Sequence, residues 1–330
     1  MKEASCDTVS VSEPQTTFSI VIPIFNEEEV IPELAKRLEK IAAAEKSLRE
    51  IIVVNDGSTD GSLKKLTEWQ RHSNCLTIIN LSRNWGHQSA FSAGLKYSTG
   101  DAVVLMDGDL EDPPELIPQL LHLWKKGFDI VYTIKKSRHQ NPFKRILTNF
   151  YYWLLKVLVS HSVNPQAGMF CLISRRVVDI LNNLDEKNRN LPNLRTFVGF
   201  KQVNVDYDRE RRFAGTPSQT FGALLRDGLN GIFSYTYLPL RIAIFVGCFL
   251  TVVFSIIAMI ILYVRLTGIQ FWVFSDIPGT QLIILLMILI GSFQIMFLGI
   301  IGEYIARLTD EAKDRPAYII DDVLENQNRD

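Results

Sequence analysis

The chain has few cysteines, and they show no pairing pattern. Its 330 residues contain four, Cys6, Cys75, Cys171 and Cys248, which lie far apart and form no CxxC pair. This spacing argues against a disulfide framework and against a zinc site. A reducing compartment fits the composition best.

Two common phosphate-binding motifs are also missing. No GxGxxG follows the first apolar stretch and no GxxxxGK[ST] occurs anywhere, so a dinucleotide oxidoreductase and a P-loop phosphotransferase lose their main support. The formal net charge is −1 and the basic residues are scattered, which gives no sign of a nucleic-acid partner. Residues 1–17 are polar and lack the apolar core of a signal peptide, so we expect a disordered tail there.

Short apolar stretches alternate with helical patterns from residue 18 onward. Runs rich in Ile and Val predict strands at 18–23, 51–54, 77–81, 102–106 and 129–133. The segments between them predict helices at about 28–48, 86–97 and 115–126, and one more that ends near residue 72. This alternation is typical of an α/β fold, in which a mostly parallel sheet carries helices on both faces.

Two carboxylates follow the fourth predicted strand. Asp107 and Asp109, separated by Gly108, come directly after residues 102–106. In such a sheet, ligands bind at the edge formed by the carboxyl ends of the strands. Neighbouring carboxylates repel each other unless a cation lies beside them, and oxygen-only ligands favour Mg²⁺ or Mn²⁺, with a diphosphate completing the shell. The sequence therefore predicts a divalent-metal site at Asp107 and Asp109.

The last hundred residues are far more apolar than the rest. Neither residues 242–264 nor residues 281–301 contain a charged side chain, and each run is long enough to cross roughly 30 Å of hydrocarbon as a helix. Basic residues lie before the first run and after the second, with only Arg265 between the runs. The positive-inside rule then predicts an integral membrane protein with two spans whose termini and soluble domain are cytoplasmic.

A third apolar run, at residues 150–159, reads FYYWLLKVLV. It is too short to span a bilayer as a helix. Its neighbouring aromatic residues fit a helix lying at a membrane interface, and its length fits a core helix equally well. Both interpretations stay open.

Several long motifs resemble those of family-2 glycosyltransferases of the inverting GT-A type, in particular the membrane-anchored synthases of polyprenyl-phosphate sugars. The matching stretches are IVIPIFNEEE (20–29), VVNDGSTDGS (53–62), LSRNWGHQSAFSAG (81–94), MDGDLEDPPE (106–115) and RRFAG (211–215), followed by the two apolar runs. With this resemblance the chain divides into a tail at 1–17, a GT-A domain at 18–220, an interfacial helix at 221–241, spans at 242–264 and 281–305, an extracytoplasmic loop at 265–280 and a cytoplasmic tail at 306–330.

The resemblance also implies ligands and site residues. Asp107 and Asp109 would hold Mg²⁺ or Mn²⁺ against the diphosphate of the donor, and Arg212 would complete the catalytic set near the same phosphates. The implied nucleotide-sugar pocket consists of Pro23, Phe25, Glu27, Val54, Asp56, Asp107, Gly108, Asp109, Lys135 and Arg212. The implied partners are a UDP- or GDP-sugar, a polyprenyl phosphate and membrane lipids. The identity of the sugar and the oligomeric state, a homo-oligomer included, stay open.

The chain departs from the family pattern at three places. Many relatives carry Gly-Asp-Phe-Arg where residues 168–171 read GMFC, and Met169 cannot act as a base. Many carry a lysine where this chain has Ser218, and a glutamine where it has Glu111.

The missing carboxylate at position 169 bears on the acceptor. A sugar hydroxyl needs a general base beside the attacking oxygen, and Asp112 or Glu111 would have to serve. A phosphate monoester has a second pKa of about 6, so it is already mostly a dianion at neutral pH and needs no base. The sequence therefore favours a lipid phosphate. Transfer to a hydroxyl of a lipid-linked saccharide, and a non-catalytic membrane scaffold of the same fold, are the alternatives.

Overall fold

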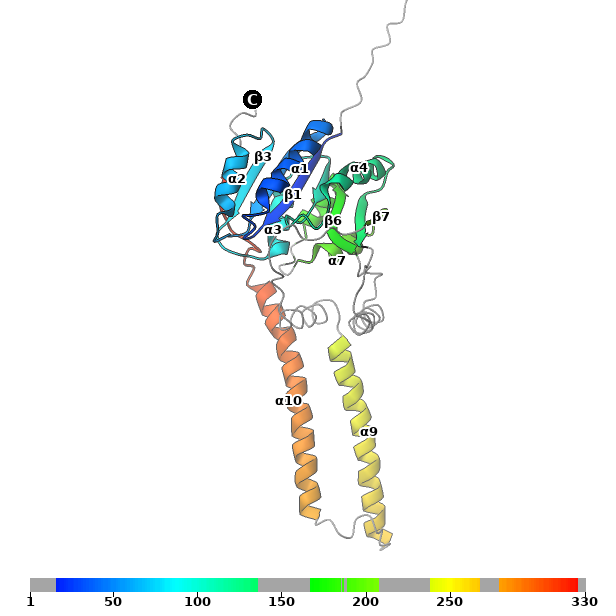
Figure 1. Ribbon diagram of the computed structural model, residues 1–330. Helices are drawn as coiled ribbons and strands as arrows, with labels where there is room; N and C mark the ends of the chain where they lie inside the picture. The colour runs from blue at the N-terminus through cyan, green and yellow to red at the C-terminus, as the bar shows by residue number, and fades with distance from the viewer. Residues whose placement is uncertain are drawn as a thin grey trace, which may run out of the picture. The chain divides into compact units, whose positions relative to one another are not determined.

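The computed structural model describes residues 16–135, 167–184, 186, 189–207, 238–267 and 279–325. They form two compact units, one built on a single sheet and one on two long helices, which we describe separately (Figure 1). The aromatic run at 150–159, nearly all of the tail at 1–17 and most of the expected interfacial helix at 221–241 lie outside the described residues.

Eight strands form one mixed sheet in the order β7-β5-β6-β4-β1-β2-β3-β8. Their bounds are β1 Phe18–Ile24, β2 Leu48–Asn55, β3 Leu76–Leu81, β4 Ala102–Leu105, β5 Ile130–Lys135, β6 Ala167–Ser174, β7 Gln202–Tyr207 and β8 Ile320–Leu324. The central strands β4, β1, β2 and β3 are parallel, as predicted, and so are β5 and β7. The mixed character comes from β6, antiparallel to β4 and β5, and from β8, antiparallel to β3.

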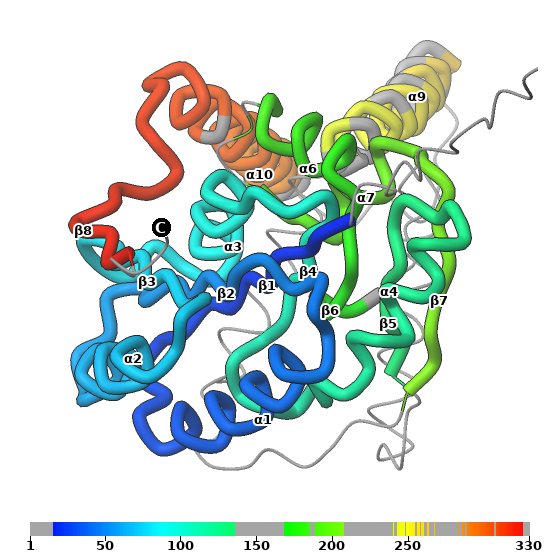
Figure 2. The backbone as a smooth tube through the Cα atoms, turned by 90° about the horizontal axis from the view of Figure 1, so that it is seen from above, coloured from blue at the N-terminus to red at the C-terminus, as the bar shows by residue number. Residues whose placement is uncertain are grey.

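Helices cover both faces of the sheet, which confirms that part of the expected fold. Their bounds are α1 Ile31–Ala44, α2 Ser62–Gln70, α3 His87–Tyr97, η1 Pro114–Leu116, α4 Ile117–Lys125, α6 Arg175–Asn182 and α7 Leu191–Val198. One face packs against α1, α2 and α4 and the other against α3, α6 and α7 (Figure 2).

Small residues let α3 approach the sheet closely. Ala90 and Ala93 are fully buried, and a Cβ on Gly94 would lie only 2.2 Å from Cγ1 of Val21 in β1. Since α3 follows the carboxyl end of β3 and then runs back across the sheet, its first turn begins at the carboxyl edge of the strands.

The first helix begins later and ends earlier than predicted. The sequence predicts a helix at about 28–48, whereas α1 spans Ile31–Ala44 with Pro32 in its first turn. Glu28 instead belongs to the preceding turn, where its carboxylate accepts a hydrogen bond from Gly61 N at 3.0 Å. A tertiary contact to the loop after β2 therefore competes with helix extension, and β2 begins at Leu48 rather than at residue 51.

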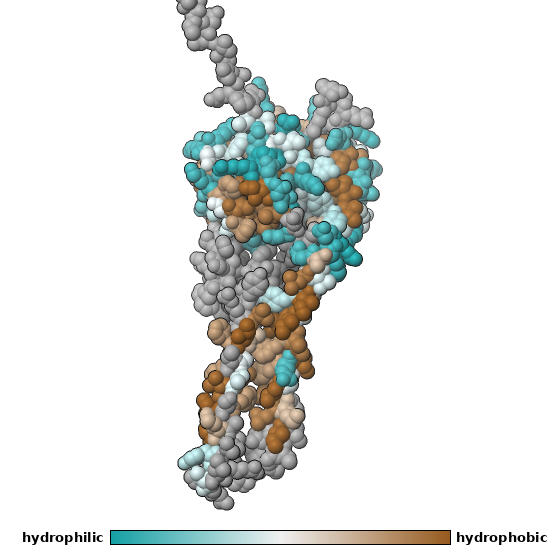
Figure 3. Space-filling view, turned by 180° about the vertical axis from the view of Figure 1, so that it is seen from behind, coloured by the Kyte–Doolittle hydropathy of each residue, from teal (hydrophilic) through white to brown (hydrophobic). Residues whose placement is uncertain are grey.

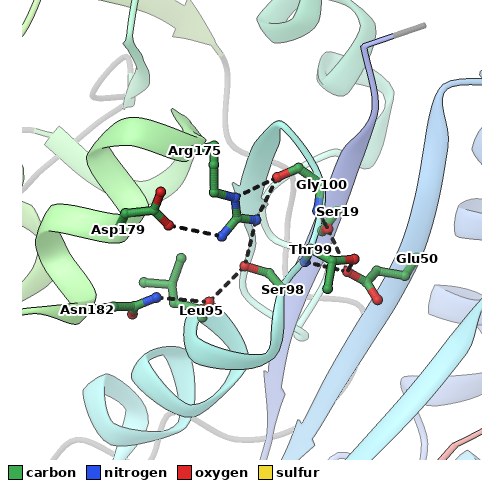
Figure 4. A network of polar contacts seen from close by, with 9 residues as sticks. All are labelled: Ser19, Glu50, Leu95, Ser98, Thr99, Gly100, Arg175, Asp179 and Asn182. Carbon is green, nitrogen blue, oxygen red and sulfur yellow. Dashed lines mark hydrogen bonds and ion pairs between the residues drawn. The ribbon is translucent and has the colours of Figure 1, made fainter. Parts of the chain in front are cut away.

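A polar network closes the amino end of the sheet (Figure 4). Glu50 is 3% exposed and accepts hydrogen bonds from Ser19 Oγ at 2.9 Å and from Thr99 N and Oγ1 at 2.7 and 2.8 Å. Ser19 Oγ in turn accepts from Gly100 N at 2.9 Å, and Arg175 Nε donates to Gly100 O at 2.9 Å. The network joins β1, β2 and the start of β4 at the end of the sheet opposite Asp107.

The second unit contains α9, Leu238–Thr267, and α10, Gly279–Ala312, which contact each other. Much of their described surface is hydrophobic (Figure 3). Within the part of the chain that the structure describes, one helical segment, Leu289–Ala312, is both long and apolar enough to cross a membrane, and none of it is buried. The apolar segment found in α9, Ala243–Phe254, is shorter. The structure thus provides one candidate span where the sequence predicts two.

The chain returns to the sheet after α10. β8 pairs with β3, with Ile78 opposite Leu324 and Leu81 opposite Ile320. Gln70 Nε2 donates to the backbone carbonyl of Leu324 at 2.6 Å. Part of residues 306–330, expected to be a tail, therefore forms the edge strand of the sheet.

Candidate active site

The acidic loop after β4 packs against the end of β1. β1, β2 and β4 run parallel and end at the same edge of the sheet. A Cβ on Gly108 would lie 2.4 Å from Ile24 Cδ1 and 3.0 Å from the carbonyl oxygen of Pro23. Only glycine therefore lets the loop that carries Asp107 and Asp109 lie this close to β1.

His87, the first residue of α3, contacts this loop. Its Nε2 lies 2.9 Å from Asp107 Oδ1, and its ring packs edge-on against Phe91 with centroids 4.8 Å apart. Burial lowers the pKa of His87, but the hydrogen bond and charge of Asp107, together with the charges of Asp109 and Asp56, outweigh burial and raise it. Three carboxylates thus make this edge of the sheet attractive to a cation.

The donor set suits a hard divalent cation that keeps part of its shell for other ligands. Asp107 and Asp109 are both half-buried, so their carboxylate oxygens are partly accessible. Asp109 Oδ1 accepts the Glu111 N–H at 3.1 Å, across a turn in which Leu110 has a φ of 59°. Among the described residues no group of three or more His, Cys, Asp and Glu side chains could hold an ion. Two carboxylates fit Mg²⁺ or Mn²⁺, because these ions commonly complete their shells with water and substrate phosphate.

Asp56 accepts backbone hydrogen bonds from the loop after β3. Its side chain is buried, and its two oxygens accept from Trp85 N at 2.7 Å and Gly86 N at 2.9 Å. Burial raises the pKa of this carboxyl, although both hydrogen bonds lower it. Asp56 is one of the residues that the family resemblance places in the nucleotide-sugar pocket. In the structure its two hydrogen bonds position the residues just before His87.

The other expected donor-pocket residues differ in accessibility. Pro23 and Val54 are buried within β1 and β2, and the side chain of Val54 packs in the core beneath α3. Phe25 is 43% exposed at the end of β1, and the backbone N–H of Glu27 donates to Ser62 Oγ at 3.0 Å. Of these four residues, Phe25 and Glu27 offer side chains at the surface.

Lys135 and Tyr207 meet the acidic loop from the ends of β5 and β7. These two residues are paired in the register of the parallel strands. Lys135 Nζ lies 3.5 Å from Asp112 Oδ1 and the Tyr207 hydroxyl donates to the same oxygen, while Asp112 Oδ2 is buried without a hydrogen-bond partner. Burial raises the pKa of Asp112, opposed by the charge of Lys135 and the hydrogen bond from Tyr207.

Met169 lies near the start of β6, on the strand next to β4. Gln88 Nε2, from the first turn of α3, donates to the Met169 sulfur at 3.5 Å. Gln88 Oε1 accepts from Leu191 N, the first residue of α7, at 3.0 Å. Gln88 therefore links α3, β6 and α7 on one face of the sheet.

Sequence reasoning missed three residues of this region: His87, Gln88 and Tyr207. His87 and Gln88 lie inside the matching stretch at 81–94, so their place in a motif was a signal that could have found them. Nothing in the local sequence marks Tyr207, whose role depends on the pairing of β5 with β7. Arg212 and Ser218 lie outside the described residues.

Comparisons with known proteins point in one direction. The family model described as glycosyl transferase family 2 matches residues 19–181. The chain is 37% identical over 304 residues to the uncharacterized glycosyltransferase YkcC of Bacillus subtilis, covering 92% of this chain and 93% of that protein. It is 32% identical over 304 residues to the bactoprenol glucosyl transferase of Shigella phage SfII, covering 92% and 96% of the two chains.

Among solved structures, the chain is similar to the mannosyltransferase PcManGT from Pyrobaculum calidifontis in complex with GDP-Man and Mn²⁺. The TM-score is 0.47 and the sequence identity is 18%. The match covers 66% of this chain and 63% of that one.

The similarity to the two bacterial and phage proteins runs through most of both chains in each case, well beyond the acidic loop. Shared apolar composition alone does not produce aligned identity of this length. The chain therefore belongs to glycosyl transferase family 2 and is a glycosyltransferase.

Proposed function

We propose that this enzyme transfers a hexose from a UDP- or GDP-sugar to a polyprenyl phosphate at the cytoplasmic face of a membrane, with inversion at the anomeric carbon. The observation that carries the proposal is the similarity, over most of both chains, to a protein named for glucosyl transfer to bactoprenol. That name makes glucose the first sugar to test.

The donor diphosphate would bind at the acidic edge of the sheet. Asp107 and Asp109 would hold Mg²⁺ or Mn²⁺, and the bound ion would offset the negative charge that builds on the leaving nucleoside diphosphate. Lys135, whose side chain is 31% exposed beside Asp112, and Arg212 would add positive charge for the same phosphates. Phe25 and Glu27 would contact the nucleoside from the end of β1.

The acceptor oxygen would attack the anomeric carbon in line with the leaving group. A bond forms between that carbon and a phosphate oxygen of the lipid, while the bond to the diphosphate breaks and its electron pair leaves with the nucleoside diphosphate. Because a phosphate dianion carries no proton at the attacking oxygen, the enzyme mainly has to position it.

The residues at positions 169 and 112 support this choice of acceptor. Met169 offers no carboxylate, and Asp112 is fully buried and ion-paired with Lys135. A hydroxyl acceptor would need a general base. Of the two residues considered for that role, Asp112 and Glu111, only Glu111 would then remain. A lipid phosphate requires neither residue.

The membrane part would hold the enzyme where its acceptor lies. We propose that both α9 and α10 span the bilayer, with the termini and the catalytic domain on the cytoplasmic side and residues 221–241 at the interface. The search for the lipid then takes place on a surface.

The test uses membranes or purified full-length enzyme with labelled sugar nucleotide and polyprenyl phosphate as the sole acceptor. The proposal expects a labelled monosaccharide lipid whose formation requires Mg²⁺ or Mn²⁺. If label appears only after a lipid-linked saccharide is supplied, the acceptor is a hydroxyl. If the protein binds nucleotide-sugar but transfers the sugar neither to polyprenyl phosphate nor to the lipid-linked saccharide, the scaffold interpretation is favoured.

A further inference from the structure

Arg195, on α7, is a buried cation without an anionic partner among the described residues. It is 2% exposed. Its Nη2 donates to the carbonyl oxygen of Gly168 at 2.9 Å, and its guanidinium carbon lies 6.0 Å from the centroid of the Tyr132 ring. Its charge also acts on the Cys171 thiol, whose pKa it lowers against the larger effect of burial. Its Nη1 is buried and, within the part of the chain that the structure describes, has no hydrogen-bond partner.

None of these neighbours neutralises the charge. A carbonyl group and an aromatic ring are uncharged, and burial raises the pKa of the Cys171 thiol, so that thiol stays protonated at neutral pH. A buried charge without a counter-ion costs several kcal/mol, and proteins normally pair such groups. No described residue therefore places an anion at Arg195, and a ligand can supply one.

Arg195 lies close to the acidic loop of the site. In the register of the antiparallel strands, Cys171 of β6 is opposite Leu105, which is two residues before Asp107. The charges of Arg195 and Asp107 both act on the Cys171 thiol. A ligand anion held by Arg195 would thus be next to the strand that carries the acidic loop.

We propose that Arg195 binds the phosphate group of the acceptor, with the unpaired Nη1 as donor. The inference rests on the proposed function and names the residue that fixes its acceptor. The planar guanidinium offers paired N–H donors that match phosphate oxygens, and Nη2 is already oriented by Gly168. The entering phosphate makes the charge-assisted hydrogen bonds that the buried arginine lacks.

Met169 gives this proposal a sequence correlate. Alternate residues of a strand face the same side of the sheet, so Met169 and Cys171 both face α7. A carboxylate at position 169 would supply Arg195 with an internal counter-ion, whereas a thioether leaves the guanidinium for a ligand. The Gln88–Met169 contact beside the first turn of α7 uses sulfur, a weak acceptor, so it opens at little cost when phosphate enters.

The main test compares Arg195→Met with the matched control Arg176→Met in the full-length enzyme. Arg176 is an exposed arginine paired with Asp129. We expect Arg195→Met to raise KM for polyprenyl phosphate by about tenfold or more, because the variant loses a charge-assisted hydrogen bond to the phosphate. KM for the nucleotide-sugar should stay within about twofold. Arg195→Lys keeps the positive charge but lacks the planar guanidinium. Its KM for polyprenyl phosphate should therefore lie between those of the wild type and Arg195→Met.

Thermal unfolding separates binding from a structural role. Removing an unpaired buried charge should leave the melting temperature of Arg195→Met equal to that of the wild type or higher. A clear fall in melting temperature, or equal losses for donor and acceptor, would overturn the proposal. Met169→Asp, with Met169→Asn as its control, should raise the melting temperature and weaken acceptor binding, because it pairs Arg195 internally. No difference between these two variants would also count against it.

A binding experiment needs no turnover, so it tests this inference separately from the proposed function. Inorganic phosphate, farnesyl phosphate and UDP are each added to wild type and to Arg195→Met at constant ionic strength. We expect inorganic phosphate and farnesyl phosphate to raise the melting temperature of the wild type and not of the variant. UDP should shift the melting temperature of both proteins equally. Loss of the UDP shift alone would assign Arg195 to the donor, and equal shifts in both proteins would refute the anion site. Failure of polyprenyl-phosphate transfer with an intact phosphate shift would refute the proposed function alone.

Discussion

The Lys135 ammonium lies 3.5 Å from the Asp112 carboxylate, whose side chain is fully buried. Lys135→Met should lower the free energy of unfolding by about 1–3 kcal/mol at pH 7. This loss is smaller than that from breaking a fully buried ion pair, because the Lys135 side chain is partly exposed. Chemical denaturation of the full chain in detergent measures the loss. The double variant with Asp112→Asn should recover part of it, since no unpaired carboxylate then remains buried.

The same pair predicts a pH dependence. Burial raises the pKa of Asp112, so the folded state binds its proton more tightly than the unfolded state. The cost of the charged carboxylate is therefore present at neutral pH and disappears as the pH falls through the raised folded pKa. Destabilisation by Lys135→Met should shrink over that acidic range. A loss that stays constant, or grows, on acidification would contradict this assignment.

Asp129 should show the opposite pH dependence. Hydrogen bonding to Arg176 lowers the pKa of this carboxyl, against the effect of burial. Its stabilisation is therefore present above the unfolded pKa and is lost as the pH falls through the lowered folded pKa. Asp129→Asn should melt at a lower temperature than the wild type at pH 7, and the two curves should converge at acidic pH. Thermal unfolding at several pH values provides the comparison.

Glu50 should matter for stability and not for substrate binding. It accepts hydrogen bonds from Ser19 and Thr99 at the amino end of the sheet (Figure 4). Glu50→Ala leaves these donors without their acceptor, so we expect a loss of about 1–3 kcal/mol in the free energy of unfolding. KM for donor and acceptor, measured below the melting temperature, should be unchanged. A selective rise in either KM would show that the network reaches the site.

Asp109 should be needed for turnover and not for folding. Asp109→Ala should reduce kcat by about a hundredfold or more, because it removes a ligand of the cation that stabilises the leaving group. Expression and membrane insertion should match the wild type. Asp321→Ala, at an exposed position in β8, is the control and should keep full activity. Wild-type turnover in metal-free buffer would refute the metal role.

Gly108→Ala tests whether the acidic loop must lie against β1. The added methyl group would meet Ile24 Cδ1 at 2.4 Å and the Pro23 carbonyl oxygen at 3.0 Å, so the loop has to shift. A displacement of about 1 Å at a reacting group can cost about a hundredfold in rate. Steady-state kinetics should show this fall in kcat. Gly291→Ala in α10, where a Cβ meets nothing within 4 Å, is the matched control.

The sequence by itself determined the alternation of strands and helices and the position of Asp107 and Asp109 at the end of β4. It also located the apolar runs of α9 and α10, one of which the structure supports as a candidate span. These features are local, because periodicity and strand termini are set by neighbouring residues.

Tertiary structure alone decided the rest. Three features each join segments distant in the chain: the pairing of Ile78 with Leu324, the burial of Asp112 beside Lys135 and Tyr207, and the hydrogen bond from Arg195 to Gly168. Periodicity shows which face of an element is apolar. Which element covers that face depends on packing free energies summed over many contacts, and no local pattern carries that sum.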